Sequence, residues 1–201
     1  MEENGLIRGG DGTLYRIRPL RAEDVEEIAA LSDYCVGVNM YPREMLYSLV
    51  DRPDHYFYVL INEENRIIGY YYQYLTDTEG MVAYSKLTPE QLHDMCPKPH
   101  PVFANMKALG LVDEYRNKKL SVPILEFAVE RLRALGADVA IATCWKKGDT
   151  VPMSHPFEYI GFRCYAITQL VWYDVPDLYC PYCRGRCRCD AANYYKILSK
   201  E

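Results

Sequence analysis

The feature that most constrains the fold is one amphipathic helix pattern between two apolar strand patterns. Apolar residues recur at three- to four-residue spacing from Leu120 to Leu135, which predicts a helix with one buried face. An apolar run at 102–112 precedes this helix, and a second run at 139–145 follows Gly136, a residue suited to end a helix. This βαβ unit at the centre of the chain predicts an open sheet with helices on both faces.

The remaining pattern predicts an α/β fold with a mixed, mostly antiparallel sheet. A short polar turn joins two of the expected strands, which is typical of an antiparallel hairpin. Residues 76–101 are rich in turn formers and predict an insertion or mobile loop with one short helix. We expect strands at 14–20, 56–61, 66–75, 102–112, 139–145 and 162–173, and helices from about 21, 42, 89, 120 and 156.

Length and charge limit the function. A chain of 201 residues with 49% hydrophobic residues can form one domain with an appendix, and we place the domain at 1–175 and a C-terminal extension at 176–201. The net charge of −5 argues against nucleic acid as a partner. No apolar run is long enough to span a membrane and the start is acidic, so we predict a cytoplasmic protein, monomer or homodimer, with no membrane partner.

The run from Leu109 to Ser121 reads LGLVDEYRNKKLS and resembles the strand, loop and helix start of motif A in the GNAT superfamily of N-acetyltransferases. The sequence YIGF at 159–162 is similar to a late Gly-Phe signature of the same family. The resemblance covers about residues 14–174. It implies a GNAT-like fold, binding of acetyl-CoA, and transfer of the acetyl group to an amine of a small molecule or peptide.

The resemblance also implies which residues bind acetyl-CoA. Unpaired amides at a helix N-terminus can satisfy the pyrophosphate oxygens, while the backbone near the strand end pairs with the pantetheine arm. The family loop reads Arg/Gln-x-x-Gly-x-Gly/Ala, and here Lys119 replaces the first glycine, which leaves either added phosphate attraction or a loop that no longer binds the cofactor. The predicted cofactor residues are Leu111, Val112, Arg116, Asn117, Lys118, Lys119, Leu120 and Ser121.

The catalytic groups that the resemblance implies are incomplete. Many family members carry a tyrosine acid four residues before the late glycine, where this chain has Phe157. The nearest alternatives are Tyr159 and His155, and Glu114 after the fourth strand is the candidate base, although each of the three also fits an ordinary surface role. Family members place the acceptor amine on the opposite side of this strand, against residues such as Asn105 and Lys107, and the 76–101 insertion would set acceptor choice if it folds there.

Four cysteines crowd into ten residues near the C-terminus. Cys180 and Cys183 form a Cys-x-x-Cys pair, and Cys187 and Cys189 could complete a tetrahedral four-sulfur site. We predict structural Zn²⁺ that fixes the tail 191–198 against the domain; a redox-active or disulfide arrangement and unpaired cysteines are the alternatives. Two rival functions therefore stay open beside the enzyme: a catalytically inactive GNAT-like binding module and a zinc-stabilised interaction protein.

Overall fold

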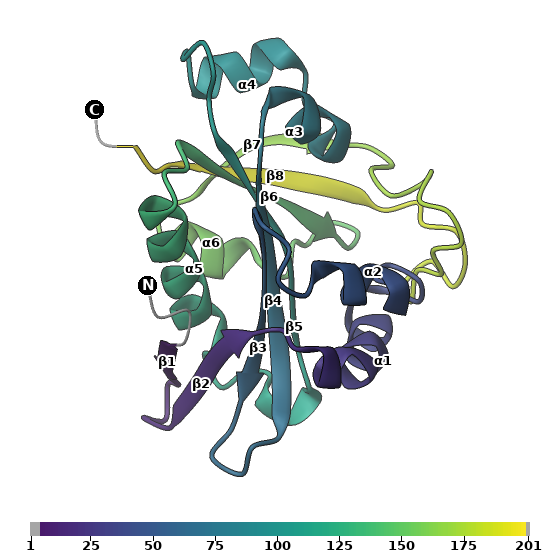
Figure 1. The fold of residues 1–201 in the computed structure, drawn as a ribbon. Helices are drawn as coiled ribbons and strands as arrows, with labels where there is room; N and C mark the ends of the chain where they lie inside the picture. Colours follow the sequence, from purple (N-terminus) through teal and green to yellow (C-terminus); the bar gives the residue numbers. More distant parts are fainter. Residues whose placement is uncertain (1–4, 200–201) are drawn as a thin grey trace.

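The strands of this chain form one eight-stranded sheet in the computed structural model, which describes residues 5–199 (Figure 1). The strand order is β1-β2-β3-β4-β5-β6-β8-β7, and neighbours are antiparallel except for the parallel pair β5 and β6. The strands are β1 (Gly5–Arg8), β2 (Leu14–Pro19), β3 (His55–Ile61), β4 (Ile67–Thr76), β5 (Phe103–Leu111), β6 (Val139–Lys146), β7 (Arg163–Thr168) and β8 (Asp190–Ile197).

Helices cover both faces of the sheet, as the sequence predicts. One core joins α5 and α6 to the sheet, and the other face packs against α1 and α2 at one end and α3 and α4 at the other (Figure 1). No helix in the described part of the chain has the length and apolar character to cross a membrane. The helices are α1 (Val25–Val36), α2 (Arg43–Leu49), α3 (Thr78–Ser85), α4 (Pro89–Met95), α5 (Ser121–Ala134) and α6 (Ser154–Tyr159), with 3₁₀ turns η1 (Ala22–Asp24) and η2 (Asp113–Tyr115).

The order of elements around the central βαβ unit is confirmed, and three segments before the C-terminal tail differ from prediction. Strand β1 has no counterpart in the prediction. The 76–101 insertion contains α3 as well as the expected α4, and Asp77 begins α3 by accepting a hydrogen bond from the Gly80 N–H at 2.9 Å. The last predicted strand, 162–173, is too long, because β7 ends at Thr168 and turns follow.

The predicted tail 191–198 is a strand inside the sheet rather than a segment fixed against it. Strand β8 lies between β6 and β7 and pairs with both along most of its length. Asn193 links the three strands, since its side chain accepts from the Thr143 hydroxyl and donates to the Thr168 hydroxyl, each at 2.8 Å. The predicted boundary at residue 175 therefore falls within the connection between β7 and β8.

Strands β5 and β6 part soon after they meet, and this geometry positions the site. Their parallel pairing covers only 103–105 with 139–141, although both strands continue well beyond it. On the other side of β5, the register with β4 shifts so that Tyr72 pairs with Ala108 and Gln73 with Met106, which leaves Lys107 as a bulged residue. Both irregularities fall at one place in the sheet. Bulges are frequent next to binding sites, where they redirect a side chain.

Candidate functional site

A cavity of about 200 Å³ occupies the opening between β5 and β6. Leu125 of α5 and Phe157 of α6 line it from one face of the sheet, and Met40 and Tyr41 line it from the connection between α1 and α2 on the other. Trp172 and Leu178 contribute from the connection between β7 and β8. The cavity therefore spans both faces of the sheet and is largely apolar and aromatic, as ligand sites generally are.

Lys107 brings a cation into this cavity. Its ammonium lies 4.1 Å from the ring centroid of Tyr84 and 5.9 Å from that of Tyr74, so two aromatic faces hold it. Burial lowers the pKa of Lys107 to about 8. Tyr84 comes from α3, so the 76–101 insertion reaches the cavity. Lys107 can thus exchange a proton close to neutral pH inside an apolar cavity.

The loop from 112 to 120 presents unpaired amides at the start of α5. Among the described residues, the backbone N–H groups of 117–120 meet no hydrogen-bond acceptor. Asn117 and Lys119 adopt left-handed conformations, with φ of 62° and 56°. Lys119 therefore keeps the backbone shape that favours the glycine expected at this position, at a cost of roughly 1–2 kcal/mol. These free donors can hold an anion.

The N-terminal hairpin supports this loop. The Gly10 N–H donates to the Lys118 carbonyl at 3.1 Å, and the Lys119 side chain lies directly over Gly10. A Cβ on Gly10 would come within 2.9 Å of the Lys119 side chain, so the close approach needs a glycine there. This contact was not predicted, because no strand was expected before residue 14.

Other predicted cofactor residues already have partners within the chain. The Arg116 guanidinium donates to the Leu111 carbonyl at 3.1 Å, pairs with Asp113 at 2.9 Å and lies over the Tyr34 ring. The Val112 N–H donates to the Ile68 carbonyl at 3.0 Å. Ser121 begins α5, and Leu120 is buried beside it, whereas Asn117, Lys118 and Lys119 are exposed. The loop thus offers backbone donors and lysine charge, while Arg116 is turned towards the strand end.

The three predicted catalytic side chains do not line the cavity. Tyr159 is 70% exposed and stacks on the exposed ring of His155, with 6.3 Å between centroids, on the outer side of α6. Glu114 is exposed in the 3₁₀ turn after β5. Phe157 does line the cavity, and it is 4% exposed and stacked on Tyr194. The structure therefore places Phe157, which has no proton to donate, at the cavity and leaves the three candidates outside it.

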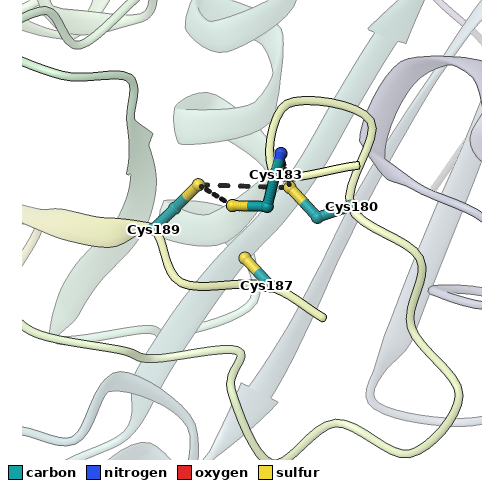
Figure 2. A group of neighbouring side chains, drawn as sticks. All are labelled: Cys180, Cys183, Cys187 and Cys189. Atoms are coloured by element: carbon teal, nitrogen blue, oxygen red, sulfur yellow. Dashed lines mark hydrogen bonds between the residues drawn. The ribbon is translucent and has the colours of Figure 1, made fainter. Parts of the chain in front are cut away.

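The four predicted metal ligands converge (Figure 2). Their sulfur atoms all lie within 4.8 Å of one another, with Cys183 to Cys189 at 3.4 Å and Cys180 to Cys189 at 4.0 Å. Four sulfurs around a tetrahedral zinc ion, each with a bond of about 2.3 Å, are about 3.8 Å apart, so the arrangement has the right size. Cys180, Cys187 and Cys189 are buried and Cys183 is half-buried.

Backbone contacts shape the cysteine site for thiolates. The Cys183 N–H donates to the Cys180 sulfur at 3.5 Å, and the Arg188 N–H donates to the Cys183 sulfur at 3.3 Å. Burial raises the pKa of Cys187 to about 11. At Cys183, the hydrogen bond from the Arg188 N–H and those with the neighbouring cysteine side chains outweigh burial and lower the pKa. Four thiolates so close together need a cation, and a divalent ion would displace the thiol protons.

Several cavity residues lie where the sequence suggested no site. Tyr84 belongs to the segment predicted as a loop, and Trp172 was assigned to the overlong last strand. Met40 and Tyr41 follow α1 without a motif of their own. Large aromatic residues in otherwise turn-rich segments were the one signal that could have pointed to them.

Comparison with known proteins places the fold. No family model matches the chain, and no curated protein sequence matches it either. Among solved structures, NAA60 of Arabidopsis thaliana in complex with a bisubstrate analogue has a TM-score of 0.69 and 12% identity over 91% of this chain and 97% of that chain.

Two further structures show the same likeness. The polyamine N-acetyltransferase of Drosophila melanogaster has a TM-score of 0.62 and 16% identity over 92% of this chain and 100% of that chain. The ribosomal-protein-S18-alanine N-acetyltransferase of Escherichia coli has a TM-score of 0.61 and 13% identity over 93% and 96%. Since such identities establish the fold alone, this chain has the fold of the GNAT N-acetyltransferases that its sequence resembles.

Proposed function

We propose that this protein is an N-acetyltransferase that moves the acetyl group of acetyl-CoA to an amine of a small molecule or peptide. The observation that carries the proposal is the cavity in the opening between β5 and β6, beside free amides at the start of α5. Pyrophosphate would bind the 117–120 amides, and the pantetheine arm would follow the unpaired side of β5 into the cavity. The three structures compared above are acetyltransferases or hold a bisubstrate analogue, which agrees with this assignment.

The reaction needs a neutral amine to attack the thioester carbonyl. The new C–N bond forms, the C–S bond breaks, and the thiolate of coenzyme A leaves. The ammonium proton must first be removed, and Lys107 is placed to accept it, because it lies in the cavity with its pKa lowered to about 8 by burial. Glu114 outside the cavity is the competing base.

The departing thiolate needs less help. A thiolate is fairly stable near neutral pH, so a dedicated acid is dispensable and Phe157 is compatible with turnover. Tyr159 or His155 could protonate the product only after a movement of α6 that turns one of them inwards.

Calorimetric titration with acetyl-CoA, followed by a screen of amine acceptors, tests the proposed function. We expect a dissociation constant in the micromolar range and acetyl transfer to at least one amine. A folded, metal-loaded sample that binds no acetyl-CoA would instead support the inactive binding module, which the buried Phe157 and the Lys119 replacement favour.

We also propose that the four cysteines hold structural zinc, since four protein thiolates leave no open position for catalysis. Metal analysis of protein purified under reducing conditions should give one zinc ion per chain. A disulfide within the group, or free thiols with no metal, would contradict this assignment.

A further inference from the structure

We propose that the zinc site forms part of the cavity wall that would face the amine acceptor, here called the acceptor wall, so that metal occupancy controls acceptor binding. The inference rests on the acetyl transfer proposed above. It gives the cysteines a role beyond fixing the chain, because the same side chains that converge on one point also border the cavity. Three independent features of the structure support it.

The first feature is that the two sites share residues. Cys180 and Cys187 belong to the four-sulfur group and also line the cavity. Leu178 and Pro181, on either side of Cys180 in the chain, line it as well. A change in the position of the Cys180 backbone would therefore move the cavity wall directly.

The second feature is a clamp onto the connection between α1 and α2. Val38 and Tyr179 exchange backbone hydrogen bonds of 3.2 and 3.1 Å, and the Asn39 side chain donates to the Asp177 carbonyl at 3.2 Å. Val36 and Met40, on either side of this contact, line the cavity. The cysteine loop is thus hydrogen-bonded to the connection between α1 and α2, and both segments lie on the same side of the sheet (Figure 1).

The third feature is charge. Among the described residues that line the cavity there is no carboxylate, and Lys107 is the one side chain with a formal positive charge. A zinc ion with four thiolates carries a formal charge of −2, so the loaded site would place negative charge beside an incoming ammonium group. Of the three arginines in the loop, Arg186 is paired with Asp174 and with the Tyr173 carbonyl, which leaves Arg184 and Arg188 to offset part of that charge.

Loss of the metal should loosen this wall without disturbing the cofactor loop. Residues 169–189 form no helix and no strand longer than an isolated bridge, so little else orders them. The free amides at 117–120 belong to a loop whose hydrogen bonds reach the turn between β1 and β2, β4 and α1 rather than the four clustered cysteines. Metal loss should therefore affect acceptor binding far more than acetyl-CoA binding.

Cys183→Ser is the variant that separates these effects. Cys183 is a ligand candidate that does not line the cavity, so its change acts on the wall only through the metal. The matched control is Cys164→Ser, an exposed cysteine on β7 outside the group. We expect Cys183→Ser to lose zinc and to raise the acceptor KM at least tenfold, while the acetyl-CoA dissociation constant changes less than twofold and the control matches the wild type.

A second measurement does not depend on acetyl transfer. Both tryptophans of the chain, Trp145 and Trp172, line the cavity and pack against the cysteine group, so their fluorescence reports on this wall. Titration of the metal-free wild type with zinc alone should shift the emission with one equivalent, and hydrogen exchange at 36–41 should slow. If zinc binds without changing fluorescence, exchange or acceptor KM, the proposal is overturned even for an active enzyme; if these readouts change but no amine is acetylated, the enzyme assignment fails instead.

Discussion

The proposed site has two ends that are built in different ways. The proposed cofactor end, beside the cavity, uses backbone from one short continuous stretch, the end of β5 and the loop before α5, and its donors are peptide N–H groups. The proposed acceptor end, in the cavity, uses side chains from α1, α3, β5, β6 and the connection between β7 and β8. A site built from backbone donors should tolerate a side-chain change such as lysine for glycine at 119, because the peptide N–H groups stay in place. A site built from side chains should change the ligand that it prefers with each substitution. This contrast predicts that variants of the two ends separate cleanly in their effects.

Zinc removal should have the largest effect on stability, and it should change ligand binding only at the acceptor end. Loss of a structural metal belongs to the few changes that cost more than about 4 kcal/mol of unfolding free energy. For a chain of this size that corresponds to a fall in Tm of roughly 10 °C. Thermal melts with and without a chelator, repeated with acetyl-CoA present, measure this. An unchanged Tm in the presence of a chelator would show that no bound metal stabilises the acceptor end.

Lys107→Met tests the point where the two ends meet. Loss of a general base lowers kcat by on the order of 100-fold, and Lys107→Arg, which stays charged, should do the same. Glu114→Gln, outside the cavity, should stay within twofold of wild type. If Glu114→Gln lowers kcat and Lys107→Met does not, the proton acceptor lies outside the cavity.

The same lysine should mark the pH dependence of stability. The pKa of Lys107 is lowered from 10.5 to about 8 in the folded state, so between these values the unfolded chain binds the extra proton and stability rises with pH. Lys107→Met should therefore be more stable than wild type below pH 8, and the difference should shrink as the pH approaches 10.5. Urea unfolding at several pH values measures it, and a constant difference would show that Lys107 is not buried in solution.

Lys119 tests the cofactor end alone. Lys119→Glu should weaken acetyl-CoA binding about tenfold, because a negative side chain would stand beside the pyrophosphate. Lys119→Gly, which keeps the left-handed backbone and removes the charge, should cost less than threefold. Calorimetry on both variants gives the comparison, and equal losses would mean that side-chain packing over Gly10 matters more than charge.

Phe157→Tyr should have the smallest effect. The change places a hydroxyl where many family members carry their acid, and because the leaving thiolate needs little protonation, kcat should stay within about twofold. A tenfold gain would show that the missing acid limits the rate.

The contrast between the two ends also explains what the sequence could predict. The helix 120–135 and its flanking strands follow from local periodicity, and the four cysteines follow from spacing, so both were placed correctly. The insertion of β8 between β6 and β7 depends on pairing between distant strands, which a local pattern does not encode. The bulge at Lys107 and the reach of Tyr84 depend on register in the same way, so the acceptor end was the harder part to predict.

The interior position of β8 also bears on how the chain folds. Strands β6 and β7 have no direct pairing with each other, and β8, which follows both in sequence, supplies their shared partner. Until residues 190–197 dock, two strand edges stay open, and open edges are sites of aggregation during folding. The cysteine loop connects β7 to the segment that docks. A metal that orders this loop would hold β8 closer to β7 and β6 and would speed the pairing of these strands during folding.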